Sequence, residues 1–376
     1  GLTGLSAART AAKAGQSVLV VDQHSPGFGA SSRNGGMLGG GHKLSIAEMT
    51  ARYGEHIALG LLREAHLDSA DFVRKVMTEE AIDCDYDQVG RFRGFWHTHE
   101  YETTARELEQ LQKLLPIEAS LLSQAQQHQA VASDLYRGGG VYHQHAAINP
   151  AKWVFGLHRA AVDHGALIQG NTAVLGLQKS PHGYLVNTVR GMVKAGKVLL
   201  ATNGYTPPQM AALHRRVFPV PSFIITTENL GRERIKQLFP SDMMVVESRA
   251  RHCYYRPSPD KTRIVFGARA ALFDAPEKFA MGQLQKLLGQ VFPQLGQIDI
   301  SHSWRGFTGF SFEFMPHVGQ IDGVWHAAGY SGNGNTLAPW LGHKAALQMI
   351  GDPAGETAFS HSVLKTRWWY HNRAWF

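Results

Sequence analysis

The chain has 376 residues, and 44% of them are hydrophobic. This content is enough to bury the core of one large domain or of two moderate ones. The formal net charge is +7, but no dense stretch of Lys and Arg with interleaved aromatic residues indicates a nucleic-acid partner. Apolar runs of about 18 residues and signal-peptide patterns are absent, so we expect a cytoplasmic protein that does not cross a membrane. The two cysteines, Cys84 and Cys253, fit neither a zinc site nor a disulfide framework, and we expect no bound metal.

The first part of the chain has the pattern of a βαβ unit. Leu5 to Ala14 repeats apolar residues at helical spacing, and Gly15 ends the predicted helix. Ser17 to Val21 predicts a short buried strand that leads into Asp22. A loop rich in glycine and serine follows from Pro26 to Gly41.

The middle of the chain predicts helices first and strands later. From about Ser45 to Gln129, Glu, Arg and Leu recur at helical spacing, which indicates mostly helix with a solvated face. A helix is predicted from Ala151 to His164, ending at Gly165. The predicted strands of this region are Val141 to Asn149, Ala166 to Gln169, Ala173 to Gln178, Tyr184 to Thr188 and Gly191 to Ala201.

The last part of the chain predicts a second sheet. From Phe218 to Arg269 the β-branched and aromatic content rises, which favours an antiparallel, substrate-binding sheet. A helix is expected from about Pro276 to Val291. A glycine-rich loop at Gly329 to Gly334 then opens a helix from about Leu337 to Ile350.

These elements predict two domains that are each discontinuous in sequence. The dinucleotide-binding domain is expected to comprise residues 1–80, 145–215 and 320–355. The substrate-binding domain is expected to comprise residues 81–144 and 216–319, and residues 356–376 form a C-terminal tail.

A nucleotide-binding motif is visible at the start of the chain. Gly1-Leu2-Thr3-Gly4 matches the last four positions of G-x-G-x-x-G, whose glycines let the backbone approach a pyrophosphate at a helix N-terminus. We expect the first glycine and the strand before it to precede Gly1 in the natural protein. About 20 residues on, Asp22 can accept hydrogen bonds from an adenosine ribose, and Gln23 stands beside it.

A second glycine-rich loop carries the most specific signal. It reads G-A-S-S-R-N-G-G-M from Gly29, so its side chains are small, hydroxylated or positively charged. The loop resembles the second flavin loop of the D-amino-acid oxidase-like family of FAD-dependent oxidoreductases, especially the branch that contains gamma-glutamylputrescine oxidase. The resemblance implies FAD contacts from Ala30, Ser31, Ser32, Arg33, Asn34, Gly35, Gly36 and Met37.

Three later segments are similar to other flavin-binding segments of that family. Ala173 and Val174 match its adenine-contacting backbone. A turn beneath the cofactor is matched by Ala201, Thr202, Asn203 and Gly204. The C-terminal flavin motif, in which a glycine loop opens a helix and offers amides to the flavin ring, is matched by Gly329, Tyr330, Ser331, Gly332, Asn333, Gly334, Asn335 and Thr336.

The resemblance implies a fold and a mode of cofactor binding. The fold is α/β: an FAD-binding Rossmann-like domain of the glutathione-reductase type, lacking its N-terminal strand here, with an interleaved antiparallel-sheet substrate domain. No cysteine follows Cys253, and the early loop has no histidine, so the FAD is expected to be noncovalent. Thr336 stands where sarcosine oxidases have a lysine that holds the substrate carboxylate, which favours an amine of the putrescine type.

The resemblance also implies an activity, namely oxidation of an amine C–N bond by hydride transfer to flavin N5, imine hydrolysis and reoxidation by O2. Two alternatives stay open: a dehydrogenase that passes electrons to a quinone or a carrier protein, and an inactive protein that keeps the FAD fold. Aromatic rings can contact an alkylammonium group and arginine can pair with a carboxylate. The candidate substrate-pocket residues are His42, Tyr254, Tyr255, Arg269, Trp304 and Arg305.

Overall fold

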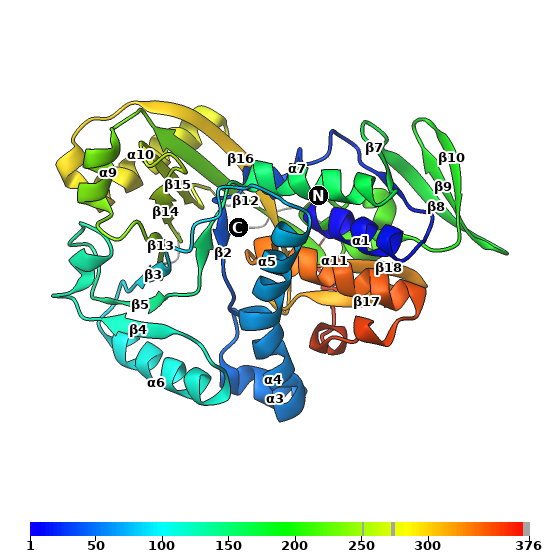
Figure 1. Cartoon of the computed structure of the whole chain (residues 1–376), viewed down its shortest axis with the longest axis horizontal. Helices are drawn as coiled ribbons and strands as arrows, with labels where there is room; N and C mark the ends of the chain where they lie inside the picture. The colour runs from blue at the N-terminus through cyan, green and yellow to red at the C-terminus, as the bar shows by residue number, and fades with distance from the viewer. Residues whose placement is uncertain (250–251, 272–274, 371–376) are drawn as a thin grey trace.

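Helix α1 (Leu2–Lys13) lies between two other helices in one of the two lobes of the molecule (Figure 1). The computed structural model describes residues 1–249, 252–271 and 275–370. Helix α1 packs against α7 (Pro150–Asp163) and α11 (Gly334–Ile350) and buries most of its residues there. Gly342 of α11 is needed for this packing, since a methyl group at that position would overlap the carbonyl oxygen of Thr3.

Short parallel strand pairs belong to the same lobe. Strand β1 (Leu19–Val21) pairs with β7 (Leu167–Gln169), and β11 (Leu199–Leu200) pairs with β18 (Val324–Ala328). Strand β18 also pairs in antiparallel fashion with β17 (His317–Ile321). A three-stranded antiparallel sheet projects from this lobe and consists of β8 (Val174–Ser180), β9 (Gly183–Thr188) and β10 (Gly191–Ala195).

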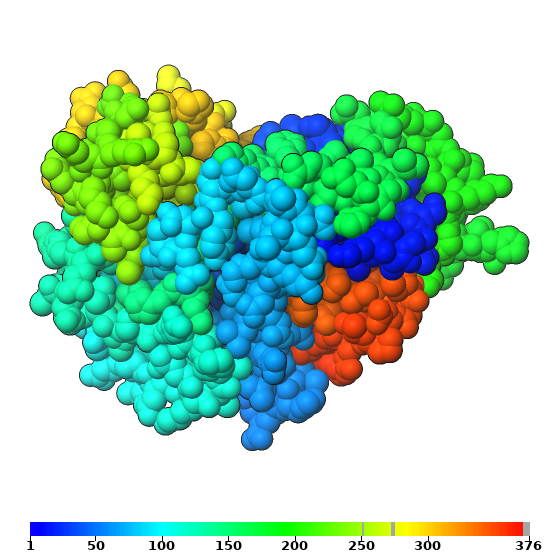
Figure 2. Space-filling view, in the orientation of Figure 1, coloured from blue at the N-terminus to red at the C-terminus, as the bar shows by residue number. Residues whose placement is uncertain are grey.

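The other lobe is built on an eight-stranded sheet with the order β16-β12-β15-β14-β13-β3-β5-β4. All neighbouring strands are antiparallel except β13 and β3, which are parallel. The two lobes lie side by side in the space-filling view (Figure 2). The strands are β3 (Arg91–Gly94), β4 (Ala119–Leu122), β5 (Gly139–Tyr142), β12 (Val217–Thr227), β13 (Met244–Glu247), β14 (Tyr254–Pro257), β15 (Ile264–Ala268) and β16 (Ile300–Ser311).

The stretch from residue 45 to residue 129 is mostly helical, as predicted, but it also contains two strands that the sequence analysis did not identify. Strands β3 and β4 lie there, next to β5 in the large sheet. Strand β3 reads Arg-Phe-Arg-Gly, so its alternation of charged and buried residues extends over only four positions and is too short to mark a strand clearly. The helices of this stretch are α3 (Ile46–Tyr53), α4 (Glu55–Arg63), α5 (Ser69–Glu79) and α6 (His99–Leu114).

Other predicted elements need smaller adjustments. The strand expected from 141 to 149 is two strands, β5 and β6 (Ala146–Ala147). The strand expected from 191 to 201 is interrupted between β10 and β11. Gly15 and Gly165 end α1 and α7 with positive φ angles of 77° and 97°, as the sequence indicates. Residues 250 and 251 of the predicted sheet and 371–376 of the predicted tail lie outside the described residues.

The large sheet has one core face and one face toward the other lobe. Phe92, Val245, Tyr255 and Phe266 are fully buried on the core face. Helices α9 (Arg232–Leu238) and α10 (Glu277–Val291) bury side chains in the same core. Successive residues of a strand point to opposite faces, so the neighbours of these core residues face the other lobe.

Replacing Gly342 by alanine tests whether close contact between α1 and α11 stabilises the fold. The added methyl group would overlap backbone, and we expect the free energy of unfolding in urea to fall by about 1–3 kcal/mol. The matched control is Gly289→Ala in α10, where a methyl group meets nothing within 4 Å. The control should be neutral or stabilising by up to about 1 kcal/mol. Equal losses in the two variants would contradict the close contact.

Candidate functional site

The N-terminus of α1 lies against the second glycine-rich loop and against the end of β1. The amide of Leu2 donates to Ser31 Oγ at 3.1 Å. Ser31 belongs to the short helix α2 (Ala30–Arg33). The nitrogen of Gly1 lies 3.8 Å from Asp22 Oδ2. The first motif, the acidic residue after β1 and the second loop therefore meet at one point.

The second loop is joined to the N-terminus of α11 by two asparagines. Asn34 Oδ1 accepts hydrogen bonds from the Gly36 amide and from Asn335 Nδ2, both at 2.8 Å. Asn335 Nδ2 also donates to the carbonyl oxygen of Met37, which begins β2 (Met37–Leu38), at 3.0 Å. Asn333 donates to the carbonyl oxygen of Gly41 at 2.6 Å. Segments about 300 residues apart in sequence are thus fixed to each other.

The turn at residues 201–204 joins the first and last motifs. A methyl group added to Gly4 would lie 3.4 Å from the Cβ atom of Ala201. Asn203 Oδ1 accepts a hydrogen bond from the Gly329 amide at 2.9 Å. Thr202 bonds Thr206 through their hydroxyl groups, and Gly204 packs against Gly309. The structure therefore brings the turn beside both helix N-termini.

Further predicted cofactor residues lie beside Asp22 or within the second loop. Thr172, just before Ala173 and Val174, donates its amide to the Asp22 carbonyl oxygen at 2.7 Å. Gln23 is exposed. Ser32 donates to the carbonyl oxygen of Gly27.

The two helix N-termini offer donors that the described chain leaves unused. Neither the N-cap of α1, Gly1, nor that of α11, Asn333, provides a side-chain cap. Uncapped N-termini carry a partial positive charge and free amides, which suit phosphate or another anion. In the first turn of α11, Thr336 Oγ1 is buried and has no hydrogen-bond partner within the described part of the chain. These features fit a dinucleotide such as FAD.

The second loop also docks onto the large sheet. The buried Arg256 of β14 donates from Nε to the Gly35 carbonyl oxygen and from Nη2 to that of Ile148, each at 2.6 Å. Gly36 has φ of +67°, and a methyl group there would overlap the Ile148 carbonyl oxygen and the Arg256 guanidinium. A methyl group on Gly35 would lie 2.8 Å from the ring of Tyr254. Only glycines allow the loop to approach the sheet this closely.

Of the predicted substrate residues, the structure brings Tyr254, Arg269 and Trp304 to the face toward the second loop. Tyr254 hydroxyl bonds Ser222 Oγ at 2.8 Å, and burial raises its pKa to about 12. Arg269 lies near Tyr254, and burial lowers the pKa of this arginine. Trp304 Nε1 donates to the carbonyl oxygen of Arg33 at 2.9 Å.

The other three predicted substrate residues lie elsewhere. Tyr255 is fully buried on the core face, where its hydroxyl bonds that of Tyr136, so contact with a substrate is excluded in this structure. The sequence made no distinction between two neighbouring tyrosines, although a strand must send them to opposite faces. Arg305 donates to the carbonyl oxygen of Ala275 at 3.4 Å, beside the start of α10. Burial lowers the pKa of His42 to about 4, and its Nε2 lies 2.9 Å from the Leu61 carbonyl oxygen.

Sequence reasoning missed a group of basic residues on the loop-facing side of the sheet. Arg91 and Arg93 alternate with the core residue Phe92 on β3. Lys43 follows the second loop directly, and burial together with Arg269, Arg91 and Arg93 lowers its pKa to about 8. The alternation of Arg91 and Arg93 about a phenylalanine was the available signal, but that segment was predicted to be helical.

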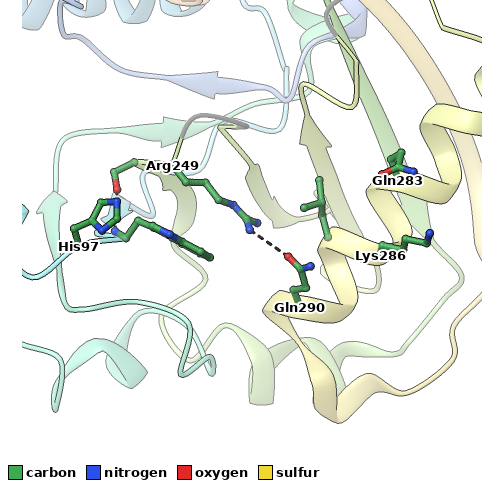
Figure 3. Close-up of a pocket in the computed structure, with 8 residues that line it drawn as sticks. His97, Arg249, Gln283, Lys286 and Gln290 are labelled. Carbon is green, nitrogen blue, oxygen red and sulfur yellow. Dashed lines mark hydrogen bonds between the residues drawn. The ribbon is translucent and has the colours of Figure 1, made fainter.

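Two surface hollows flank the large sheet. One includes four predicted residues and is lined by Ser32, Arg33, Phe223, Pro276, Glu277, Ser303, Trp304 and Arg305. The other lies beside α10 (Figure 3) and contains none of them. There the Arg249 guanidinium stacks on Trp96, donates to Gln290 at 3.2 Å and pairs with Glu247. Its charge is therefore satisfied, and we do not assign a site to this second hollow.

Comparison with known proteins identifies the family. The family of FAD dependent oxidoreductases called DAO matches residues 1–347. The chain belongs to this family. It is therefore an FAD-dependent oxidoreductase, and the predictions of FAD, of enzyme class and of an α/β fold with a Rossmann-like domain are confirmed.

Individual relatives agree with this assignment. The gamma-glutamylputrescine oxidoreductase of Escherichia coli is 29% identical over 368 residues, which cover 96% of this chain and 84% of that protein. A probable oxidoreductase, OrdL, of Haemophilus influenzae is 29% identical, with coverages of 94% and 81%. The crystal structure of glycine oxidase from Geobacillus kaustophilus matches with a TM-score of 0.77 at 20% identity, covering 98% of this chain and 96% of that chain. The glycine oxidase likeness concerns the fold alone.

The remaining features concern membrane-spanning helices and groups of metal ligands. Among residues 1–249, 252–271 and 275–370, no helix is long and apolar enough to cross a membrane. The same ranges contain no group of three or more His, Cys, Asp or Glu side chains placed to hold a metal ion.

Replacing Asn335 by alanine tests the junction between the second loop and α11. The change removes donors to Asn34 and Met37, and each lost hydrogen bond costs about 0.5–1.5 kcal/mol. We expect lower thermal stability and weaker FAD binding, measured by fluorescence titration of the apoprotein. Asn187→Ala, on the exposed side of β9, is the control and should change neither property. Unchanged FAD affinity in Asn335→Ala would show that the junction does not shape the cofactor site.

Proposed function

We propose that the protein oxidises the C–N bond of a primary or secondary amine of the polyamine or gamma-glutamyl-polyamine type, with O2 as electron acceptor. The observation that carries this proposal is the junction of the flavin-like motifs at the N-termini of α1 and α11, directly opposite the Tyr254 face of the sheet. The likeness to a gamma-glutamylputrescine oxidoreductase over nearly the whole chain supports the substrate class.

The residues at this junction suit the separate parts of FAD. Asp22 can accept the ribose hydroxyls, because only one of its oxygens is engaged by a backbone amide, that of His24 at 3.0 Å. The free amides at the start of α1, with Ser31 beside them, suit the pyrophosphate. The start of α11, with the unpartnered Thr336 hydroxyl, suits the polar edge of the flavin.

The described cysteines support noncovalent binding of the cofactor. Cys84 is buried beside Met77 in the core of the α1 lobe, and burial raises its pKa to about 12. Cys253 is buried on the core face of the sheet, where burial likewise raises its pKa to about 12. Both thiols are therefore protonated at neutral pH and lie away from the junction of the motifs.

The reaction removes two electrons from the amine. FAD, when bound, supplies the acceptor for a hydride from the carbon next to the nitrogen, and O2 later takes the two electrons to give H2O2. The amine nitrogen gives up a proton, the resulting imine adds water, and a carbonyl compound and ammonia or a smaller amine are released. The protein has to orient the carbon and keep the nitrogen unprotonated.

The loop-facing side of the sheet provides the groups for this task. Tyr254 presents a ring next to Gly35, and its raised pKa keeps the phenol neutral. An aromatic ring at this place can contact an amine through its face. The positive charge of Arg269, near Tyr254, disfavours protonation of a neighbouring amine.

Anaerobic mixing of the purified flavoprotein with amines tests the reaction. We expect putrescine or gamma-glutamylputrescine to bleach the visible flavin absorbance, and sarcosine to bleach it more slowly. Readmitting O2 should restore the absorbance and form H2O2 in proportion to the amine consumed. Bleaching that O2 does not reverse, but a quinone does, would favour a dehydrogenase. A flavoprotein that no amine reduces would contradict amine oxidation.

The substitution Asp22→Asn tests the place of the ribose. Asparagine keeps an acceptor for the His24 amide but removes the charge, and charged hydrogen bonds contribute about 1.5–3 kcal/mol. We expect the dissociation constant of FAD to rise about tenfold or more. Asp163→Asn, at the exposed end of α7, is the control and should bind FAD like the parent protein. Equal affinities in all three proteins would place the ribose elsewhere.

A further inference from the structure

The loop-facing side of the large sheet carries a group of positive charges, which we call the cationic face: Lys43, Arg91, Arg93 and Arg269. Burial and the charges of the three arginines together lower the pKa of Lys43 to about 8. Lys43 retains solvent-exposed surface, although protein atoms surround much of its side chain. His252 lies in the same field, and burial with the charges of Lys43, Arg269 and Arg91 lowers its pKa to about 3.

One carboxylate lies near this charge: although burial opposes the shift, hydrogen bonds and the charge of Arg93 lower the pKa of Glu100. In the described ranges 1–249, 252–271 and 275–370, no ion pair joins a member of the cationic face to an aspartate or glutamate. Arg91 is surrounded by histidines and by Tyr142. Burial, together with the charge of Arg91, lowers the pKa values of His66 and His145. Grouped cations without an ion-paired counter-charge are unfavourable in the free protein, which points to an anionic ligand.

A second observation points the same way. Arg91 Nε is buried and has no hydrogen-bond partner in the described part of the chain. Its Nη2 donates to the Gly40 carbonyl oxygen at 3.3 Å, which places the guanidinium beside the end of the second loop. Burial lowers the pKa of Arg91 to about 10. A buried guanidinium nitrogen without an acceptor is costly unless a ligand supplies one.

The sheet register gives the distance between this charge and the Tyr254 side of the site. Tyr254 pairs with Val246, and Val246 pairs with Arg93, so the three residues form a row on one face. Neighbouring strands are about 4.8 Å apart, so the backbones of Tyr254 and Arg93 are roughly 10 Å apart. An anion held at Arg93 would therefore lie several bonds away from a carbon held beside Tyr254.

We propose that Lys43, Arg91 and Arg93 form a subsite for a carboxylate at the far end of the amine substrate. The inference rests on the proposed amine oxidation and names its substrate class: an amine whose chain ends in a carboxylate, such as a carboxyacyl amide of a diamine. A free diamine carries a second positive charge, which the cationic face would repel. The carboxylate would supply the missing acceptor of Arg91 Nε and an ion-paired counter-charge for Lys43 and Arg93.

Three substrates with the same reacting end test the proposal. N-glutarylputrescine carries a terminal carboxylate, N-acetylputrescine has no charge at the far end, and putrescine has a positive charge there. Stopped-flow reduction of the holoenzyme should give a kcat/KM at least tenfold higher for N-glutarylputrescine than for N-acetylputrescine, with putrescine lowest. Equal values for the glutaryl and acetyl compounds would overturn the carboxylate subsite and leave amine oxidation in place. Failure of every amine to reduce the flavin would instead overturn the proposed function.

The substitution Arg93→Gln separates the subsite from a general effect on the enzyme. We expect KM for N-glutarylputrescine to rise about tenfold or more, which is the effect of losing one charged hydrogen bond. The kcat for that substrate and all constants for N-acetylputrescine should stay within about threefold, as expected for a group that binds and does not react. Arg106→Gln, exposed on α6, makes the same change of charge outside the cationic face and should leave both substrates unaffected. An equal loss for the two substrates in Arg93→Gln would overturn the assignment.

A binding measurement provides a readout that does not depend on turnover. N-butylglutaramate carries the carboxylate and lacks the oxidisable amine, so it should bind without reducing the flavin. We expect it to raise the melting temperature of the holoenzyme, since a ligand that binds only the folded state stabilises it. The shift should be absent with N-butylacetamide and smaller in Lys43→Gln, whose fold is checked by circular dichroism. A shift of equal size with both compounds would contradict recognition of the carboxylate.

Discussion

The close contact between α1 and α11 is the constraint on which the arrangement of the site depends. Gly342 lets the two helices approach until it meets the Thr3 carbonyl oxygen, and the hydroxyl groups of Thr3 and Tyr330 hydrogen-bond at 2.7 Å. Two uncapped helix N-termini are thereby held next to each other, although they belong to opposite ends of the chain. Both present free amides at neighbouring positions, which suits a long anionic cofactor better than either helix alone.

The two faces of the large sheet carry different kinds of side chain. The core face uses large apolar side chains, while the other face uses arginine, tyrosine and glycine. Gly267 illustrates the difference, because a methyl group there would overlap the ring of Tyr254. The glycine allows that ring to lie flat across β15 and to reach the second loop. A single strand can therefore stabilise the fold with one residue and serve the site with the next.

Much of the fold and of the cofactor region could be predicted from the sequence, because their signals are local. Helical periodicity, glycine stops and glycine-rich loops are each contained in a few consecutive residues, as in α1 and in the loop from Gly29 to Met37. The loop-facing side of the large sheet could not be predicted in the same way. Arg91 and Arg93 lie near Lys43, about 50 residues earlier in the chain, only in the folded protein. Arg93 is aligned with Tyr254 by the parallel pairing of β3 with β13, which are about 150 residues apart in sequence. Strands of four residues also contain too few alternating positions to be distinguished reliably from a helical segment.

The attachment of the second loop to both lobes affects how ligands can arrive. Asn335 holds the loop from one lobe, and the buried guanidinium of Arg256 holds it from the other. Swinging the lobes apart would break charged hydrogen bonds of Arg256 to Gly35 and Ile148 and leave a buried cation without acceptors. The second loop therefore resists separation of the two lobes. Access of small molecules to the sheet by separation of the lobes therefore carries the cost of breaking these hydrogen bonds.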